Sequence, residues 1–180
     1  MQIHHHHISS PAQISYCTLE IPSNYLQECI KEAYNLGDSM NNATNLQASM
    51  STYTVWEETN QFNLAFDKIM DTIKLIFPIK DSRYQYNLDN AWSAIFKKGN
   101  SAKSHNHHPS SISWVYYLKT TNNSSPLIFP DCQNLQIFPS NSLLVLFPSY
   151  LNHYVPEQTV NEDRICLVGN MGWKWIGTDS

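Results

Sequence analysis

The chain carries little charge of either sign. Asp, Glu, Lys and Arg make up 14% of its 180 residues, and the formal net charge is -4. Proteins that bind duplex nucleic acid normally display clustered lysine and arginine. The densest basic segment here is Lys97-Lys98, with Lys103 nearby. We therefore expect no nucleic-acid partner.

Long hydrophobic runs are also missing. The longest spans residues 143–147, far below the ~18 to 20 apolar residues of a membrane-spanning helix, and the N-terminus has no signal-peptide pattern. No Cys-x-x-Cys pair occurs, which argues against a zinc knuckle or a redox dithiol. We expect a cytoplasmic protein without a membrane segment, in which four thiols are reduced: Cys17, Cys29, Cys132 and Cys166.

The length suits one domain with a sizeable core, and neither a repeat nor a linker interrupts residues 11–180. Residues 1–10 contain the run His4-His5-His6-His7. Such a run is typical of an expression tag or a disordered leader, so we leave it out of the fold prediction.

Periodicity predicts helices in the first half of the chain. Apolar residues recur at three- and four-residue steps from Tyr25 to Tyr34, with Ser23 as a candidate N-cap and Gly37 as the stop. A second apolar stripe begins at Glu57 or Thr59 and ends before Pro78, which terminates a helix. We expect a strand over residues 11–20, a loop over 41–50 and a β-prone run over 51–56.

After Pro78 the pattern changes to short β-prone runs separated by turn residues. Without helical periodicity between them, these runs favour an antiparallel sandwich or barrel of the jelly-roll kind. The predicted fold is therefore mainly β with N-terminal helices (α+β). The runs are residues 84–88, 91–97, 111–119, 126–129, 135–138, 142–147, 150–155 and 164–171.

The most informative stretch is His105-Asn106-His107-His108-Pro109. On an extended chain, side chains two residues apart point to the same face, so His105 and His107 can share a metal ion. His108 then points the other way. A third histidine, His153, follows an apolar strand and a proline turn 46 residues after His107. We expect it to join the pair, since a sandwich brings distant segments together.

Arg164 opens an otherwise apolar strand. A buried guanidinium is costly unless an anion meets it, so one interpretation is a bidentate clamp for a carboxylate. The alternative is an edge-strand arginine that reaches solvent or pairs with Glu162 or Glu157. Alternating apolar residues elsewhere predict packing instead of recognition: Trp92, Ala94 and Phe96 in the core, and Trp173 and Trp175 on a terminal strand.

Taken together, the order His-x-His, Val-Tyr-Tyr-Leu, Phe-Pro-Ser-x-x-x-His and Arg-Ile ending in Asn resembles the non-haem Fe(II)/2-oxoglutarate oxygenases. It is most similar to the small phage and bacterial members, and more distantly to prolyl hydroxylases. The resemblance covers roughly residues 91–171. It implies a double-stranded β-helix (jelly roll) flanked by helices, with Fe(II) and 2-oxoglutarate as cofactors, O2 as co-substrate and ascorbate as a reductant.

Position by position, the resemblance implies that His105 and His153 are iron ligands. It implies that Arg164 and Tyr117 hold the distal carboxylate of 2-oxoglutarate and that Asn170 lines the substrate side. The strand alternation puts Tyr117 on one face and Tyr116 on the other.

One position departs from the family. Where the superfamily has a carboxylate two residues after the first histidine, this chain has His107, so Asp131 is a further carboxylate to locate. The expected activity is an oxygenase, a hydroxylase that releases succinate and CO2. Two alternatives remain: a non-catalytic β-roll that binds metal or a small ligand, and a three-histidine dioxygenase of cupin type that needs no cosubstrate. The sequence leaves the primary substrate open, whether a protein side chain or a small molecule.

Overall fold

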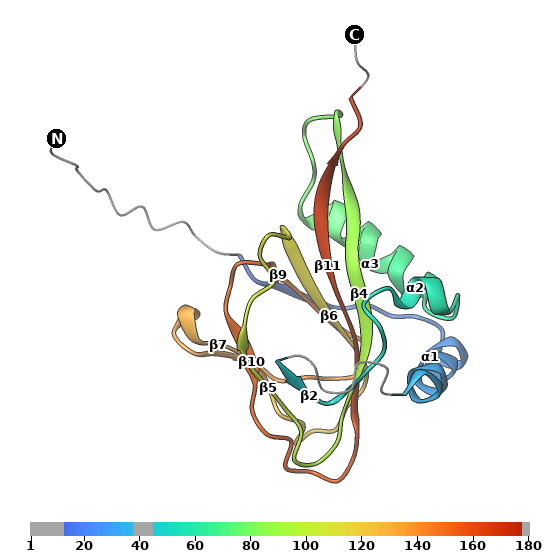
Figure 1. The fold of residues 1–180 in the computed structure, drawn as a ribbon, viewed down its shortest axis with the longest axis vertical. Coiled ribbons are helices and arrows are strands. Elements are labelled where there is room, and N and C mark those ends of the chain that lie inside the picture. Colours follow the sequence, from blue (N-terminus) through green and yellow to red (C-terminus); the bar gives the residue numbers. More distant parts are fainter. Residues whose placement is uncertain (1–12, 38–44, 178–180) are drawn as a thin grey trace, which may run out of the picture.

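The computed structural model describes residues 13–37 and 45–177, so the predicted leader at residues 1–10 lies outside the described part. The described chain is mainly β and forms two antiparallel sheets (Figure 1). The six-stranded sheet has the order β1 (Ser15–Thr18), β9 (Leu143–Pro148), β6 (Ile112–Lys119), β11 (Arg164–Trp175), β4 (Tyr84–Phe96) and β3 (Ser49–Met50). The five-stranded sheet has the order β2 (Leu46–Gln47), β5 (Ser101–His105), β10 (His153–Val155), β7 (Leu127–Phe129) and β8 (Leu135–Ile137).

The helices pack on the outer face of the six-stranded sheet. They are α1 (Ser23–Leu36), α2 (Val55–Glu58) and α3 (Asn63–Ile76), and all three lie on the same side of β4 and β11 (Figure 1). Their buried residues, such as Ala33 and Ile69, join Trp114, Tyr116 and Ile165 of the sheet in one hydrophobic cluster. Burial of one apolar stripe per helix is what the predicted periodicity required.

A second hydrophobic cluster fills the space between the two sheets. It takes the alternate residues of the same strands, for example Val115 and Tyr117 from β6 and Cys166 from β11, together with Phe129 and Val155 from the five-stranded sheet. Strand alternation thus sends one set of side chains to the helices and the other to the interior. This interior is where the candidate site lies.

Strands β4 and β11 pair along almost their whole lengths and extend together beyond the rest of the sheet (Figure 1). Their register shifts once, because Asn170 pairs with Asn90 whereas Met171 pairs with Leu88. Asp89 is therefore the extra residue of a β-bulge. Trp173 and Trp175 lie on the extension, where they contact Tyr84 and remain 60% and 50% exposed, so the predicted packing is only partial.

Several predicted boundaries were wrong. Residues 84–88 and 91–97 form one strand, and β5 was not predicted. The expected loop at 41–50 contains β2 and β3 within its described part, and the β-prone run at 51–56 runs into helix α2. The N-cap of α1 is Pro22, not Ser23, and no side chain caps the helix. No helix in the described ranges is long and apolar enough to cross a membrane.

Candidate metal centre and adjoining cavities

Two short strands of the five-stranded sheet carry the histidines. His105 ends β5 and His153 begins β10, and the antiparallel pairing places these two residues directly opposite each other. His107 follows two residues after His105, where its backbone N–H donates to the carbonyl of Ser149 at 2.8 Å. The strand pairing and this hydrogen bond bring residues that are nearly fifty positions apart in the sequence into side-chain contact.

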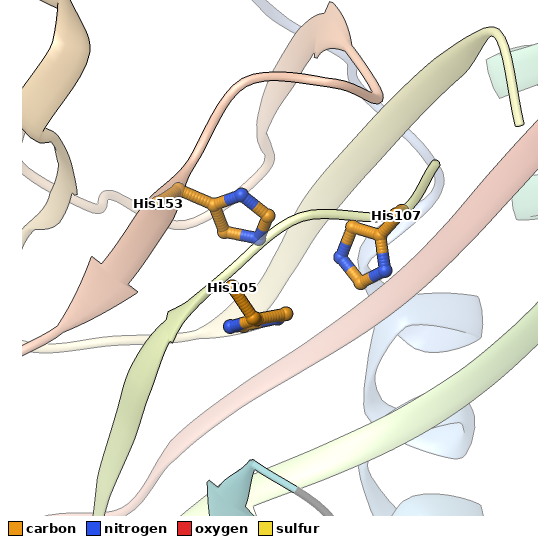
Figure 2. A group of neighbouring side chains, drawn as sticks. All are labelled: His105, His107 and His153. Atoms are coloured by element: carbon orange, nitrogen blue, oxygen red, sulfur yellow. The ribbon is translucent and has the colours of Figure 1, made fainter. Parts of the chain in front are cut away.

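The three imidazole rings face one another (Figure 2). Ring centroids are 5.0 Å apart for His105 and His107, 4.4 Å for His105 and His153, and 5.0 Å for His107 and His153. One ring nitrogen from each lies within 4.8 Å of the other two, which is a group that can hold a metal ion. His108 is exposed and outside this group, as strand alternation predicted.

Backbone carbonyls fix the tautomers of two of these rings. The Nδ1 atom of His105 lies 2.7 Å from the carbonyl oxygen of Lys103, and that of His153 lies 3.1 Å from the carbonyl oxygen of Leu151. A carbonyl only accepts, so Nδ1–H donates and Nε2 keeps its lone pair. This is the outer hydrogen bond that metal-ligating histidines usually make.

Burial keeps the three rings neutral. Desolvation, with the neighbouring imidazoles as a smaller cause, lowers the pKa of His153 to about 3 and that of His107 to about 4. Burial also lowers the pKa of His105, opposed by its hydrogen bond to Lys103. Three neutral imidazoles are the protonation state that a transition metal requires.

A chain of polar side chains ties the two histidine-bearing segments together on the outside. Asn106 Nδ2 donates to Asn152 Oδ1 at 3.1 Å, and Asn152 Nδ2 donates to Asp131 Oδ2 at 2.8 Å. Asp131 is exposed, and it is not part of the metal-binding group among the described residues. The sequence prediction missed the two asparagines, although each adjoins a predicted ligand.

Arg164 is 1% exposed and forms no ion pair within the described chain, so the edge-strand alternative with Glu162 or Glu157 is wrong. Its guanidinium lies over the rings of Phe96 and Tyr117, 4.6 and 5.0 Å from their centroids. Nη2 donates to the Tyr117 hydroxyl at 3.1 Å, whereas Nε and Nη1 have no hydrogen-bond partner. Unpaired buried donors on a cation are costly, so this side chain lacks an anion.

Tyr117 faces the interior and is fully buried, whereas Tyr116 faces the helices, as predicted. Burial raises the pKa of the Tyr117 hydroxyl, with Arg164 opposing the shift. The hydroxyl therefore stays protonated and can donate to an anion while it accepts from Arg164.

Two cavities adjoin the histidines. The inner cavity, of about 40 Å³, is lined by His105, His107, His153 and Arg164 among others. The outer cleft, of about 840 Å³, is lined by His105 and His107 but not by Arg164. His105 and His107 therefore lie between the small inner cavity, which Arg164 lines, and the large outer cleft.

Asn170 lines the outer cleft, six residues along β11 from Arg164. Its Oδ1 accepts from the Ser113 hydroxyl at 2.6 Å, and its Nδ2 donates to Asn90 Oδ1 at 2.6 Å. Ser113 also lies 2.8 Å from the Ser149 hydroxyl, and Ser149 is the residue that binds the His107 backbone. Asn170 is thus connected to the histidine loop through buried hydrogen bonds.

Trp92 belongs to the interior core, as predicted, and it also borders the cavities. It is buried, but its indole lines both cavities, its ring centroid lies 5.8 Å from that of His107, and its Nε1–H has no hydrogen-bond partner. Ala94 and Phe96 are buried as expected.

The donor groups of these residues match a divalent transition metal together with a carboxylate. Imidazole nitrogen suits Fe, Zn, Cu and Ni, and three ligands leave metal positions open. The orphaned N–H groups of Arg164 form a fork that matches a carboxylate.

No family model and no curated protein matches the sequence. Several solved structures do match the fold. A viral collagen prolyl hydroxylase from Paramecium Bursaria Chlorella virus-1, in complex with 2OG, has a TM-score of 0.68 and 13% identity over 88% of this chain and 94% of that one. A Pseudomonas putida prolyl-4-hydroxylase gives 0.63 and 15% over 88% and 91%. HygX from Streptomyces hygroscopicus, with nickel and 2-oxoglutarate bound, gives 0.67 and 9% over 89% and 83%. The chain therefore has the fold of the 2-oxoglutarate-Fe(II) oxygenases.

Proposed function

We propose that the chain is an Fe(II)- and 2-oxoglutarate-dependent oxygenase. In this proposal His105, His107 and His153 hold the iron, and Arg164 and Tyr117 hold the distal carboxylate of 2-oxoglutarate. The observation that carries it is the buried Arg164 guanidinium, whose two unpaired donors line the same cavity as the three imidazoles.

When bound, iron and 2-oxoglutarate supply the oxidising chemistry, in which O2 is consumed and succinate and CO2 are released. The protein orients them. The carbonyls of Lys103 and Leu151 hold two imidazoles with Nε2 free, and the Arg164 fork aligns the far carboxylate. The cavity walls, including Phe96, Val115 and Leu127, exclude bulk water.

The third imidazole supports a variation on the usual ligand set. A neutral His107 in place of a carboxylate leaves the metal site one unit of charge more positive, which favours a dianionic cosubstrate. The same substitution supports a second candidate, a non-catalytic β-roll that binds metal and a dicarboxylate. A cupin-type dioxygenase without cosubstrate would have no use for the buried Arg164.

Finer assignments extend this proposal. We assign hydroxylation as the reaction, ascorbate as a reductant, the cytoplasm as the location and the small phage and bacterial oxygenases as the nearest group. We also propose that residues 11–180 form a single double-stranded β-helix domain covered by helices, with the primary substrate approaching past Asn170.

The test is turnover of 2-oxoglutarate without primary substrate, followed as succinate release with added Fe(II), ascorbate and O2. His105→Ala should abolish metal binding at the three-histidine site, and with it turnover. Arg164→Met should retain metal binding but raise the 2-oxoglutarate concentration needed for half-maximal rate by about tenfold or more, because a charge-assisted hydrogen bond to a buried group contributes about 1.5 to 3 kcal/mol.

Matched controls use residues of the same type outside the three-histidine group and the inner cavity. His108→Ala removes the exposed neighbour of the ligands, and Arg83→Met removes an exposed arginine paired with Asp81. Both should behave as wild type. Wild-type turnover in His105→Ala and Arg164→Met would refute the proposal, whereas tight metal and 2-oxoglutarate binding without succinate would favour the non-catalytic candidate.

A further inference from the structure

The outer cleft has the position of a primary-substrate site, and its chemistry restricts what it can bind. It opens beside His105 and His107 and is lined largely by uncharged polar groups and aromatic rings. Within the described chain, its lining contains no lysine or arginine and a single carboxylate, that of Asp89.

The bulge in β4 explains why Asp89 reaches the cleft. In a regular strand, consecutive residues point to opposite faces, but here both Asp89 and Asn90 line the cleft. The register shift opposite Asn170 and Met171 leaves Asp89 without a partner on β11. Bulges near active sites commonly re-aim a side chain in this way.

Its neighbours hold the Asp89 carboxylate in place. The Ser110 hydroxyl donates to Oδ2 at 2.6 Å, and Ser110 belongs to the loop that follows the histidine motif. On the other side lies Gly172, where an added Cβ would come within 2.6 Å of Oδ1. The absence of a side chain at Gly172 makes room for the carboxylate.

No cation among the described residues satisfies this carboxylate. Asp89 forms no ion pair in the described ranges, and it accepts only from Ser110 and, at 3.4 Å, from Asn87 Nδ2. Two oxygens offer about four acceptor sites, so capacity remains for a cationic ligand.

A second unpaired group belongs to Trp92, which lines both the outer cleft and the inner cavity. The Trp92 indole N–H is buried without a partner, and Trp92 is 94% buried, being 6% exposed. A buried N–H without an acceptor is costly. The Trp92 ring lies beside that of His107, with centroids 5.8 Å apart, whereas Asp89 is exposed on β4.

We propose that the outer cleft binds a primary substrate that carries an ammonium group, with Asp89 receiving the ammonium and Trp92 donating to a substrate oxygen. This rests on the proposed function for the identity of the cleft as the substrate site. The charges of Arg164 and Asp89 would also direct different ligands to the two cavities. Arg164 attracts an anion to the inner cavity, and Asp89 repels anions from the outer cleft.

The test is binding to the full chain without iron or 2-oxoglutarate, so that its outcome does not depend on turnover. The probes are primary amines that also carry a hydroxyl or carbonyl oxygen, each paired with the alcohol and the carboxylic acid of the same skeleton. Dissociation constants come from NMR titration of the indole N–H signals, with that of Trp92 assigned by its loss in Trp92→Phe. Amines should bind about fivefold more tightly than their alcohols, the upper end for an exposed ion pair, and acids most weakly.

The decisive variant is Asp89→Asn, which keeps the shape and an acceptor for Ser110 but loses the charge. It should erase the preference for amines, whereas Asp67→Asn, the same change on an exposed part of α3, should keep it. The proposal is overturned if no amine binds, if amines and alcohols bind wild type equally, if Asp89→Asn retains the preference, or if bound amines leave the Trp92 signal unmoved. If amines bind selectively in this test but the wild-type chain releases no succinate in the turnover assay, only the proposed function is refuted.

Discussion

His153 lies directly opposite His105 in the pairing of β10 with β5, and their ring centroids are 4.4 Å apart. The backbone ladder therefore fixes the spacing of two candidate ligands before any metal binds. Each ring is also oriented by a carbonyl two residues earlier in its own segment, Lys103 or Leu151. Such a site is preorganised, since little conformational entropy is left to lose on metal binding.

Removal of one ligand should therefore abolish tight metal binding without unfolding the sheet. We expect His153→Ala to weaken Zn(II) or Ni(II) binding by more than the ~10- to 100-fold that loss of an outer hydrogen bond costs. Isothermal titration calorimetry measures the affinity, with the His4–His7 run replaced by alanine in every variant so that only the three-histidine site is titrated, and His108→Ala is the matched control. Unchanged affinity in His153→Ala would show that this residue is not a ligand.

The metal-free protein should lose stability as the pH falls. Burial lowers the pKa of His153 to about 3 and of His107 to about 4, from an ordinary value of 6.5. Below about pH 6.5 these histidines bind protons in the unfolded chain but not in the folded chain. The free energy of unfolding therefore falls as the pH is lowered, until the pH passes the pKa values of the folded state. We expect a loss of about 1 to 2 kcal/mol per histidine by about pH 5.

Urea denaturation of the chelator-treated protein at several pH values measures this slope. His107→Gln should flatten it, because one depressed group is removed, while His108→Gln should leave it unchanged. A slope that is equal in wild type and His107→Gln would contradict the assignment.

The bridge from Asn106 through Asn152 to Asp131 should position the ligands. Asn152→Ala removes both hydrogen bonds of the bridge, and we expect metal affinity to fall by up to about tenfold, the low end for an outer contact. Thermal unfolding of the metal-free protein should change little. Asn35→Ala, an exposed asparagine on α1, is the control, and equal affinities in both variants would exclude a positioning role.

Gly169 should tolerate no side chain. A Cβ there would lie 2.3 Å from Cζ2 of Trp114 and 3.0 Å from the carbonyl oxygen of Asn90. Overpacking of this kind costs about 1 to 3 kcal/mol, so Gly169→Ala should lower the free energy of unfolding by at least that much. In a double-mutant cycle, Trp114→Phe should relieve part of the cost; strictly additive effects would locate the strain elsewhere.

The sequence was informative about the site wherever strand alternation decided the outcome. His105 and His107 point into one group, and Tyr117 points inward whereas Tyr116 faces the helices. Alternation is a local property, and these residues needed only the knowledge that the segments are extended.

Features that depend on partners elsewhere in the chain escaped prediction. Strand β5 reads Ser-Ala-Lys-Ser-His and lacks an apolar pattern, because it is held by β2 and β10 and buries only Ala102. Asp89 and Asn90 look like a turn between two strands, but the register with β11 turns them into a bulge inside one strand. The sequence also did not show that Trp92 lines the cavities, because an apolar pattern predicts burial but does not distinguish a core residue from a cavity wall.

The candidate ligands and the candidate anchor belong to different layers. His105 and His153 come from the five-stranded sheet, and Arg164 and Tyr117 come from the six-stranded sheet. Between the layers, Phe129 and Phe147 meet with ring centroids 5.0 Å apart, and both contact His153. This aromatic pair packs between the two sheets beside His153. Under the proposed function, the thickness of the sandwich would therefore set the distance between the metal ligands and the carboxylate anchor.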